Sequence, residues 1–259
     1  MRDITLEELL TAGCHFGHQV NRRNPKADEY IFESRSNVHI INLEKTREGL
    51  LAAAEYVKGL SKRDGSLIVV GTKRQAKAIV DEEVGRGLKE GGGKLYSITA
   101  RWVGGTLTNF SEVSKNVKKL KDITELLSTS KKEEYTKREQ LMFEKEKQKL
   151  TDFYGGISQM TDIPDALFII GTQGEDTAVS EAQKMDVETV GITDTNADPS
   201  LIDYAIPAND DAVGSIKLIT NFLIDAWIEG KKEAGKAAEK EAAAKEKEAA
   251  KEAKKAKKE

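Results

Sequence analysis

The chain has 259 residues and a net charge of −3, a length that suits one large α/β domain or a domain with an insertion. It has no run of about 18 apolar residues, and the acidic residues near its start are unlike a secretory signal peptide, so we expect a cytoplasmic protein without a membrane partner. Cys14 is the single cysteine, which excludes an intramolecular disulfide and a cysteine-rich metal site.

The N-terminal part predicts a short helix, a basic loop, a strand and a longer helix. Residues 5–8 (TLEE) form a capping box, in which hydroxyl and carboxylate satisfy each other's amides at a helix start. Residues 21–26 (NRRNPK) are polar and basic, and proline and asparagine favour irregular backbone there. Residues 38–43 (VHIINL) predict the first buried strand, and residues 44–60 have the apolar spacing of a helix.

The next segment predicts two further strands around a second capped helix. Residues 66–71 (SLIVVG) are apolar without alternation, as expected when helices cover both faces of a parallel sheet. Residues 72–75 (TKRQ) form a second capping box. Amides at that helix start, beside Lys73 and Arg74, predict an anion site. Residues 95–98 (LYSI) are the third predicted strand.

Residues 101–109 (RWVGGTLTN) lead from this strand into a basic helix and have two interpretations. As a nucleic-acid contact, Arg101 supplies a forked phosphate donor, and the glycines let backbone approach a ligand closely. The alternative is a strand-to-helix turn with Trp102 in the core. We expect Trp102 to attach the following helices to the sheet, and Arg101, Thr108 and Asn109 to face RNA.

Two consecutive helices are predicted within residues 109–152. Apolar residues recur at three- and four-residue steps across residues 113–127, with lysines on the opposite face, which indicates an amphipathic helix with a basic exposed side. Residues 133–150 are highly charged with sparse apolar positions. Together they predict a coiled-coil-like helical hairpin, inserted in the α/β domain and projecting from it.

The α/β pattern resumes after this insertion. Strands are predicted at residues 165–171, 189–193 and 204–207, and helices at residues 175–185 and 215–227. Alternating strands and helices indicate a doubly wound parallel sheet, in which ligands gather outside the carboxyl ends of the strands.

Four regions follow from these patterns. Residues 1–108 and 153–230 are the two parts of the α/β domain, and residues 109–152 are the inserted hairpin. Residues 231–259 contain almost only alanine, lysine and glutamate. This tail has nothing with which to cover a core, so we expect a mobile, net-positive extension despite its helix propensity.

The motifs argue against an enzyme. The chain lacks the dinucleotide fingerprint Gly-x-Gly-x-x-Gly, the phosphate-binding loop Gly-x-x-x-x-Gly-Lys-Ser/Thr and the nucleophile elbow Gly-x-Ser-x-Gly. No cofactor is therefore required, although histidine and carboxylate ligands suit zinc. The candidate ligands are His15, His18, Asp194 and Asp211, with Asp198, Asp203 and Asp210 nearby in the sequence. Ordinary packing of the histidines, and turns capped by aspartate side chains, are the alternatives.

The charge distribution favours nucleic-acid binding. Residues 51–150 contain 21 Lys or Arg and 14 Asp or Glu, whereas residues 151–230 contain 2 and 15. This asymmetry predicts two partners of opposite character, or an acidic surface that only aids solubility. Dispersed cations suit a structured RNA, which is bound mostly through phosphates and 2′-hydroxyls. The candidate RNA-binding residues are Arg22, Arg23, Lys26, Arg35, Lys73, Arg74, Lys77, Arg101, Thr108, Asn109, Lys115, Lys118 and Lys119.

Taken together, the motifs resemble the bacterial type of the small-subunit ribosomal protein S-two family. The matching segments are residues 12–18 (AGCHFGH), 24–26 (NPK), 38–46 (VHIINLEKT), 70–74 (VGTKR), 101–109 (RWVGGTLTN), 164–168 (PDALF), 194–199 (DTNADP) and 206–212 (IPANDDA). In order, they span about residues 5 to 228. The tail after residue 230 has no matching counterpart.

This resemblance implies a flavodoxin-like parallel sheet with an inserted helical hairpin, and a non-catalytic, structural role in translation. It implies a place on the small ribosomal subunit near the junction of head and body, in a ribonucleoprotein. The implied partners are small-subunit ribosomal RNA and other small-subunit proteins, including the large S-one protein, whose docking requires this family. The acidic segment is the candidate docking surface. Zinc in some family members adds weight to the histidine and aspartate candidates.

Overall fold

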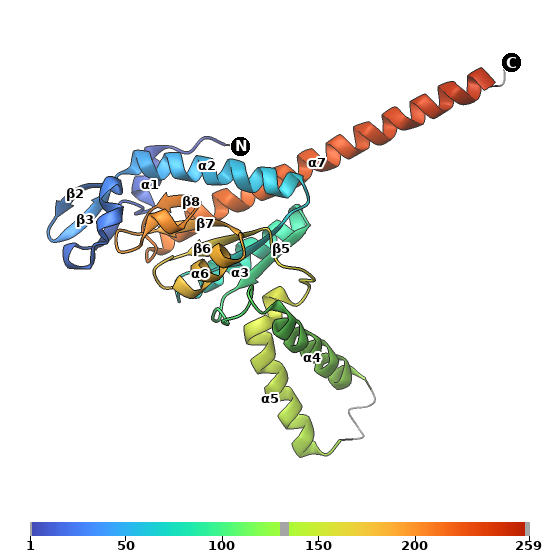
Figure 1. Cartoon of the computed structure of the whole chain (residues 1–259), viewed down its shortest axis with the longest axis horizontal. Coiled ribbons are helices and arrows are strands. Elements are labelled where there is room, and N and C mark those ends of the chain that lie inside the picture. Colours follow the sequence, from blue (N-terminus) through green and yellow to red (C-terminus); the bar gives the residue numbers. More distant parts are fainter. Residues whose placement is uncertain (1, 130–134, 257–259) are drawn as a thin grey trace.

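A five-stranded parallel sheet lies at the centre of the molecule (Figure 1). The structure is a computed structural model, which describes residues 2–129 and 135–256, and the side chains up to residue 236. Its strands are β4 (Ser66–Val70), β5 (Lys94–Ile98), β6 (Ala166–Ile170), β7 (Glu188–Thr193) and β8 (Tyr204–Pro207). They lie in the order β5-β4-β6-β7-β8, all parallel. Numbered within the sheet this is 2-1-3-4-5, the flavodoxin-like order, so the predicted fold class is confirmed.

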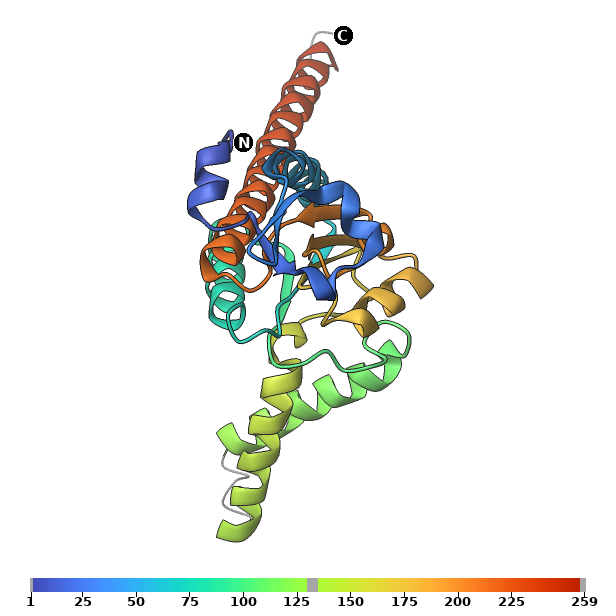
Figure 2. The same ribbon diagram turned by 90° about the vertical axis from the view of Figure 1, so that its left-hand side faces the viewer.

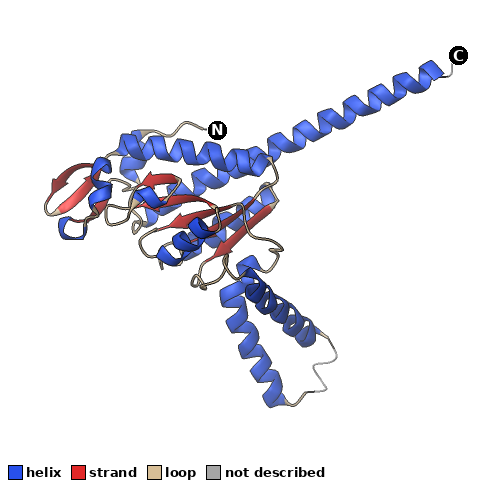
Figure 3. Ribbon diagram, viewed as in Figure 1, coloured by secondary structure: helices blue, strands red, loops and turns tan. Residues whose placement is uncertain are grey.

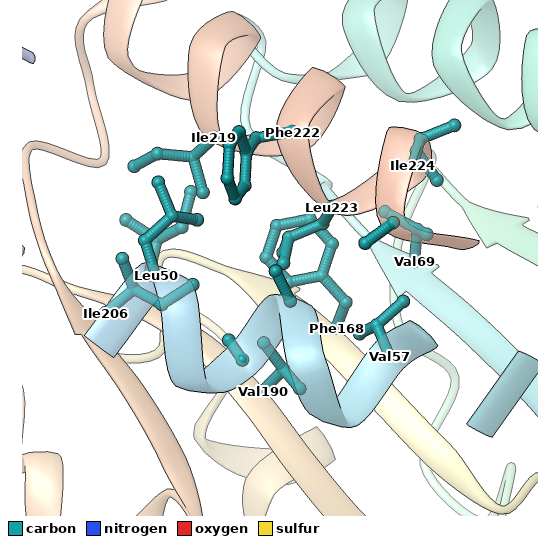
Figure 4. Packing of buried hydrophobic residues seen from close by; sticks show 14 of the residues in the cluster. Leu50, Val57, Val69, Phe168, Val190, Ile206, Ile219, Phe222, Leu223 and Ile224 are labelled. Carbon is teal, nitrogen blue, oxygen red and sulfur yellow. The ribbon is translucent and has the colours of Figure 1, made fainter. Parts of the chain in front are cut away.

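Helices cover both faces of this sheet. One face packs against α2 (Leu43–Lys62), α3 (Lys77–Glu90) and α7 (Val213–Ala256). Figure 4 shows Leu50 and Val57 of α2 and Leu223 of α7 around Phe168 of β6. The other face packs against α6 (Asp176–Lys184) and the base of the hairpin. Burial on both faces explains why these strands lack alternation.

The predicted helical hairpin is confirmed and consists of α4 (Phe110–Ser128) and α5 (Lys137–Tyr154). It projects from the α/β body, on another side than the C-terminal half of α7 (Figures 1 and 2). The buried residues of α4 are Val113, Val117, Leu120 and Ile123, spaced as one helical face. Of α5, only Tyr154 is buried, so the hairpin is anchored mainly through its base.

A second, smaller sheet was not expected. β1 (Phe16–Gln19), β2 (Ile31–Arg35) and β3 (Val38–Ile41) are antiparallel in the order β1-β3-β2. The predicted strand at residues 38–43 is confirmed as β3, but its place in the alternating parallel sheet is wrong, because it pairs within this small sheet. Ser36 and Asn37 have φ of 50° and 64°, and two such residues between paired strands make a tight hairpin turn.

The remaining elements refine the helix boundaries. The capping box of Thr5 and Glu8 is confirmed at the start of α1 (Leu6–Thr11). The second capping box is wrong, because α3 begins at Lys77 after an N-cap alanine without a side-chain hydrogen bond. Short 3-10 helices are η1 (Val20–Arg22), η2 (Pro25–Tyr30), η4 (Gly155–Ile157) and η5 (Pro199–Leu201).

The C-terminal tail, for which we expected a mobile, net-positive extension, continues α7 as one helix up to Ala256 (Figure 3). Its composition of good helix formers accounts for the helical backbone. Among the described helices, none combines the length and apolarity needed to cross a membrane.

Candidate nucleic-acid interface

The loops that carry most predicted site residues meet at one edge of the parallel sheet. The carboxyl ends of parallel strands share an edge, so residues 71–76 after β4, residues 99–109 after β5 and residues 194–198 after β7 lie along it. The basic N-terminal loop joins them, because the Asn24 amide donates to the Thr195 carbonyl at 2.8 Å. Basic and acidic segments that are far apart in the sequence therefore share one surface region.

Ion pairs join the two kinds of segment at this edge. Lys73 Nζ lies 2.7 Å from Asp210 Oδ1 and 2.8 Å from Asp211 Oδ1. His18 Nδ1 lies 3.0 Å from Asp194 Oδ2, and its Nε2 lies 3.6 Å from Asp211 Oδ2. The hydrogen bond to Asp194 raises the pKa of His18, although burial opposes it. The basic and acidic segments, which we predicted to serve two different partners, thus partly neutralise each other's charges within the protein.

Lys73 fills the crevice where flavodoxin-like folds hold their ligands, between the carboxyl ends of β4 and β6. Gly171, at the end of β6, has a φ of +80°, and a Cβ there would lie 2.7 Å from Lys73 Cε and 2.9 Å from Asp210 Oδ2. Burial lowers the pKa of the Lys73 ammonium, but the charge and hydrogen bond of Asp210 outweigh burial and raise it. Lys73 is therefore committed to an internal ion pair, which argues against the predicted phosphate contact.

Only part of the predicted metal set comes together. His18, Asp194 and Asp210 place one ligand atom each within 4.8 Å of one another. A histidine and two carboxylates fit zinc by type, but Lys73 pairs with Asp210 at 2.7 Å, so a zinc ion there would have to displace that ammonium. Asp211, the other predicted carboxylate, lies beside His18 at the rim.

The other metal candidates lie elsewhere. The His15 ring lies against that of Phe16, with centroids 3.9 Å apart and an interplanar angle of 40°, and His15 is outside the group formed by His18, Asp194 and Asp210. Asp198 accepts from Lys26 Nζ at 2.7 Å, and Asp203 accepts from the Thr189 hydroxyl at 2.7 Å. These two aspartates have the ordinary structural roles of the alternative interpretation.

The segment that joins β5 to α4 wraps around one buried carboxylate, that of Glu181 on α6. Glu181 Oε1 accepts hydrogen bonds from Trp102 Nε1 at 3.2 Å and from the Gly105 amide at 2.7 Å. Its Oε2 accepts from the Leu107 amide at 3.0 Å, and from the amide and hydroxyl of Thr108 at 3.2 Å each. Five donors thus satisfy a carboxylate that is only 6% exposed.

The hydrogen bonds to Glu181 fix the conformation of residues 101–109. Burial raises the pKa of its carboxyl, but the hydrogen bonds from the surrounding amides outweigh burial and lower it. Trp102 is 5% exposed, so its predicted structural role is confirmed, and Thr108 serves this anchor with both of its donors. We did not predict a role for Glu181 from the sequence. The signal that could have indicated it is a glutamate on the apolar face of α6, next to the buried Ala178 and Ala182.

The predicted RNA-binding cations are all exposed apart from the half-buried Lys73. Some already have a carboxylate partner: Arg23 with Asp28, Lys26 with Asp198, Lys115 with Glu112 and Lys119 with Glu146. The others have no ion pair with any residue that the structure describes: Arg22, Arg35, Arg74, Lys77, Arg101 and Lys118. This second set, the unpaired cations, is available to an anionic partner.

One family model matches most of this chain. The model described as ribosomal protein S2 matches residues 9–230. The match covers the small antiparallel sheet, the parallel sheet and the hairpin, and it ends inside α7 where the alanine, lysine and glutamate tail begins.

Proposed function

The chain belongs to the ribosomal protein S2 family, because the family model covers far more than half of it, and on this premise we propose how it serves as a structural protein of the small ribosomal subunit. It binds small-subunit ribosomal RNA in the cytoplasm through the carboxyl edge of the parallel sheet and the hairpin. The family is structural and not enzymatic, which is the ground for proposing no catalytic activity.

The unpaired cations carry this proposal. Arg74 and Lys77 follow β4, Arg101 follows β5, and Lys118 lies on the exposed face of α4. Loops on one edge and a projecting helix together present separated positive charges, and separated charges can follow the phosphates of a folded RNA. Exposed cations without an internal partner retain their full attraction for phosphate, whereas Lys73 does not.

Salt dependence of binding tests this proposal. The full chain is titrated into fluorescently labelled small-subunit ribosomal RNA at several salt concentrations. The logarithm of the association constant is expected to fall linearly with the logarithm of the salt concentration. Arg74→Ala and Arg101→Ala should each reduce the slope by about one. Lys89→Ala is the control, because this exposed lysine lies at the end of α3, away from the carboxyl edge.

Binding that ignores salt, or equal slopes in the wild type and both arginine variants, would contradict a phosphate-binding role for this edge. The same titration with a random RNA of equal length separates general charge attraction from recognition of ribosomal RNA.

The small antiparallel sheet supports a second contact, the docking of the S-one protein. Phe16 and Phe32 are 50% and 70% exposed, and Val20 beside them is 38% exposed. Asp211 is exposed at the neighbouring edge. Exposed apolar side chains next to carboxylates are typical of a protein contact. We expect Phe32→Ser to weaken capture of purified S-one protein, with Leu88→Ser as the matched control; equal capture would contradict this surface.

A further inference from the structure

A pocket of about 530 Å³ lies where the hairpin meets the α/β body. Its wall on the body side is the start of the segment that follows β5, including Arg101 and Trp102. Its other walls come from α4 and α5, including Lys149 and Phe153. This volume is within the range of pockets that hold small organic groups, and the pocket is separate from the crevice that Lys73 fills.

The floor of the pocket is aromatic and held in place. The Trp102 indole donates to Glu181 at 3.2 Å, and the Tyr154 hydroxyl accepts from Asn116 Nδ2 at 3.3 Å. Both rings are buried, whereas Phe153 is half-buried beside Tyr154. The ring of Phe153 is therefore accessible to an occupant of the pocket, whereas Trp102 and Tyr154 beneath it are held by their hydrogen bonds.

The rim of the pocket is positively charged. Lys119 pairs with Glu146 across the two helices, which leaves that pair neutral. Arg101 and Lys149 also line the pocket, and neither has an ion pair with a described residue. An occupant with an aromatic ring and a negative charge would satisfy both the floor and the rim.

We propose that this pocket takes one unstacked nucleotide of a single-stranded RNA segment, such as a bulge, and this inference rests on the proposed RNA-binding function. The base stacks on Phe153, and its phosphate lies between Arg101 and Lys149. Stacking on aromatic side chains with a nearby cation is the usual way in which proteins hold unpaired bases. A nucleotide in this position bridges the hairpin and the body, so RNA binding fixes the direction of the hairpin.

The test uses the full chain and two short RNA duplexes that differ only by one bulged 2-aminopurine nucleotide. The wild type should bind the bulged RNA more tightly, with quenching of the 2-aminopurine fluorescence as its base stacks. Phe153→Leu keeps an apolar side chain of similar size but removes the ring. It should weaken binding of the bulged RNA about five- to a hundredfold and leave binding of the plain duplex unchanged.

Lys149→Glu is the second variant, because this side chain is exposed and its change leaves the core intact. It should remove the preference for the bulge, whereas Lys89→Ala should retain it. Equal binding of both RNAs by the wild type, or equal loss for both RNAs in Phe153→Leu, overturns the pocket and leaves the proposed function standing. No binding of ribosomal RNA by the wild type overturns both. Displacement of the bulged RNA by adenosine monophosphate at equal concentration would show a mononucleotide site and overturn the RNA assignment.

Discussion

Replacing Glu181 with glutamine tests the anchor on which residues 101–109 depend. The substitution keeps the size of the side chain but turns one oxygen, which accepts two or three hydrogen bonds, into a donor. Whichever way the amide turns, at least two N–H groups lose their acceptor: Trp102 Nε1 and the Gly105 amide, or the Leu107 and Thr108 amides.

The magnitude follows from the burial of this site. A buried polar group without a partner costs about 1–3 kcal/mol, so two such groups reduce the free energy of unfolding by about 3 kcal/mol. For a chain of this size, that corresponds to a fall in the melting temperature of roughly 6–12 °C.

Urea unfolding, followed by far-ultraviolet circular dichroism, measures this loss, and amide hydrogen exchange locates it. Exchange should increase first at Gly105 if the new NH2 group replaces Oε1, or at Leu107 and Thr108 if it replaces Oε2. Glu188→Gln is the matched control, because this glutamate is exposed at the start of β7 and its change should stay within about 0.5 kcal/mol. A Glu181→Gln variant as stable as this control would refute the anchoring role of the carboxylate.

Three further predictions concern stability, and a fourth concerns zinc binding. The folded-state pKa of Glu181 is lowered, so the stability that its carboxylate contributes is complete above the unfolded pKa of about 4.3 and is lost as the pH falls through the folded value. The difference in free energy of unfolding between the wild type and Glu181→Gln should therefore be constant from pH 7 to 5 and shrink below pH 5. A difference that does not change with pH would contradict the lowered pKa. Lys73→Met leaves the buried Asp210 without its counter-ion and should cost about 3 kcal/mol in the same urea assay, whereas the control Arg74→Ala, which removes an exposed cation, should leave stability nearly unchanged. The Lys73→Met variant should also bind zinc more tightly in calorimetric titration, and unchanged affinity would contradict the competition. Gly171→Ala places a methyl group against the Lys73 side chain and should lower the melting temperature by several degrees, whereas an unchanged melting temperature would show that the crevice can relax.

The sequence predicts those features that depend on neighbouring residues. The parallel strands are continuous apolar runs and the hairpin has helical periodicity, so both are visible in a short window. The small antiparallel sheet was missed because residues 38–43 are as apolar as a core strand. The tight turn at Ser36 and Asn37 was the local signal that distinguished the two cases.

The site depends on contacts that periodicity does not reveal. Thr108 meets Glu181 across 73 residues and Lys73 meets Asp211 across 138. The prediction of two oppositely charged surfaces treated the acidic residues as one block of sequence. The parallel sheet instead places the carboxyl ends of β7 and β8 along the same edge as that of β4, with β6 between them. Opposite charges then pair there, and only the unpaired cations stay available for RNA.

Sedimentation of a cell lysate tests most directly whether the protein is a constituent of the small ribosomal subunit. The lysate is separated on a sucrose gradient at low magnesium, where the subunits part, and the chain is detected by immunoblotting. We predict that it moves with the small subunit, stays there at moderate salt and leaves at high salt. Recovery of the chain only at the top of the gradient, under conditions in which other small-subunit proteins remain bound, would contradict the assignment.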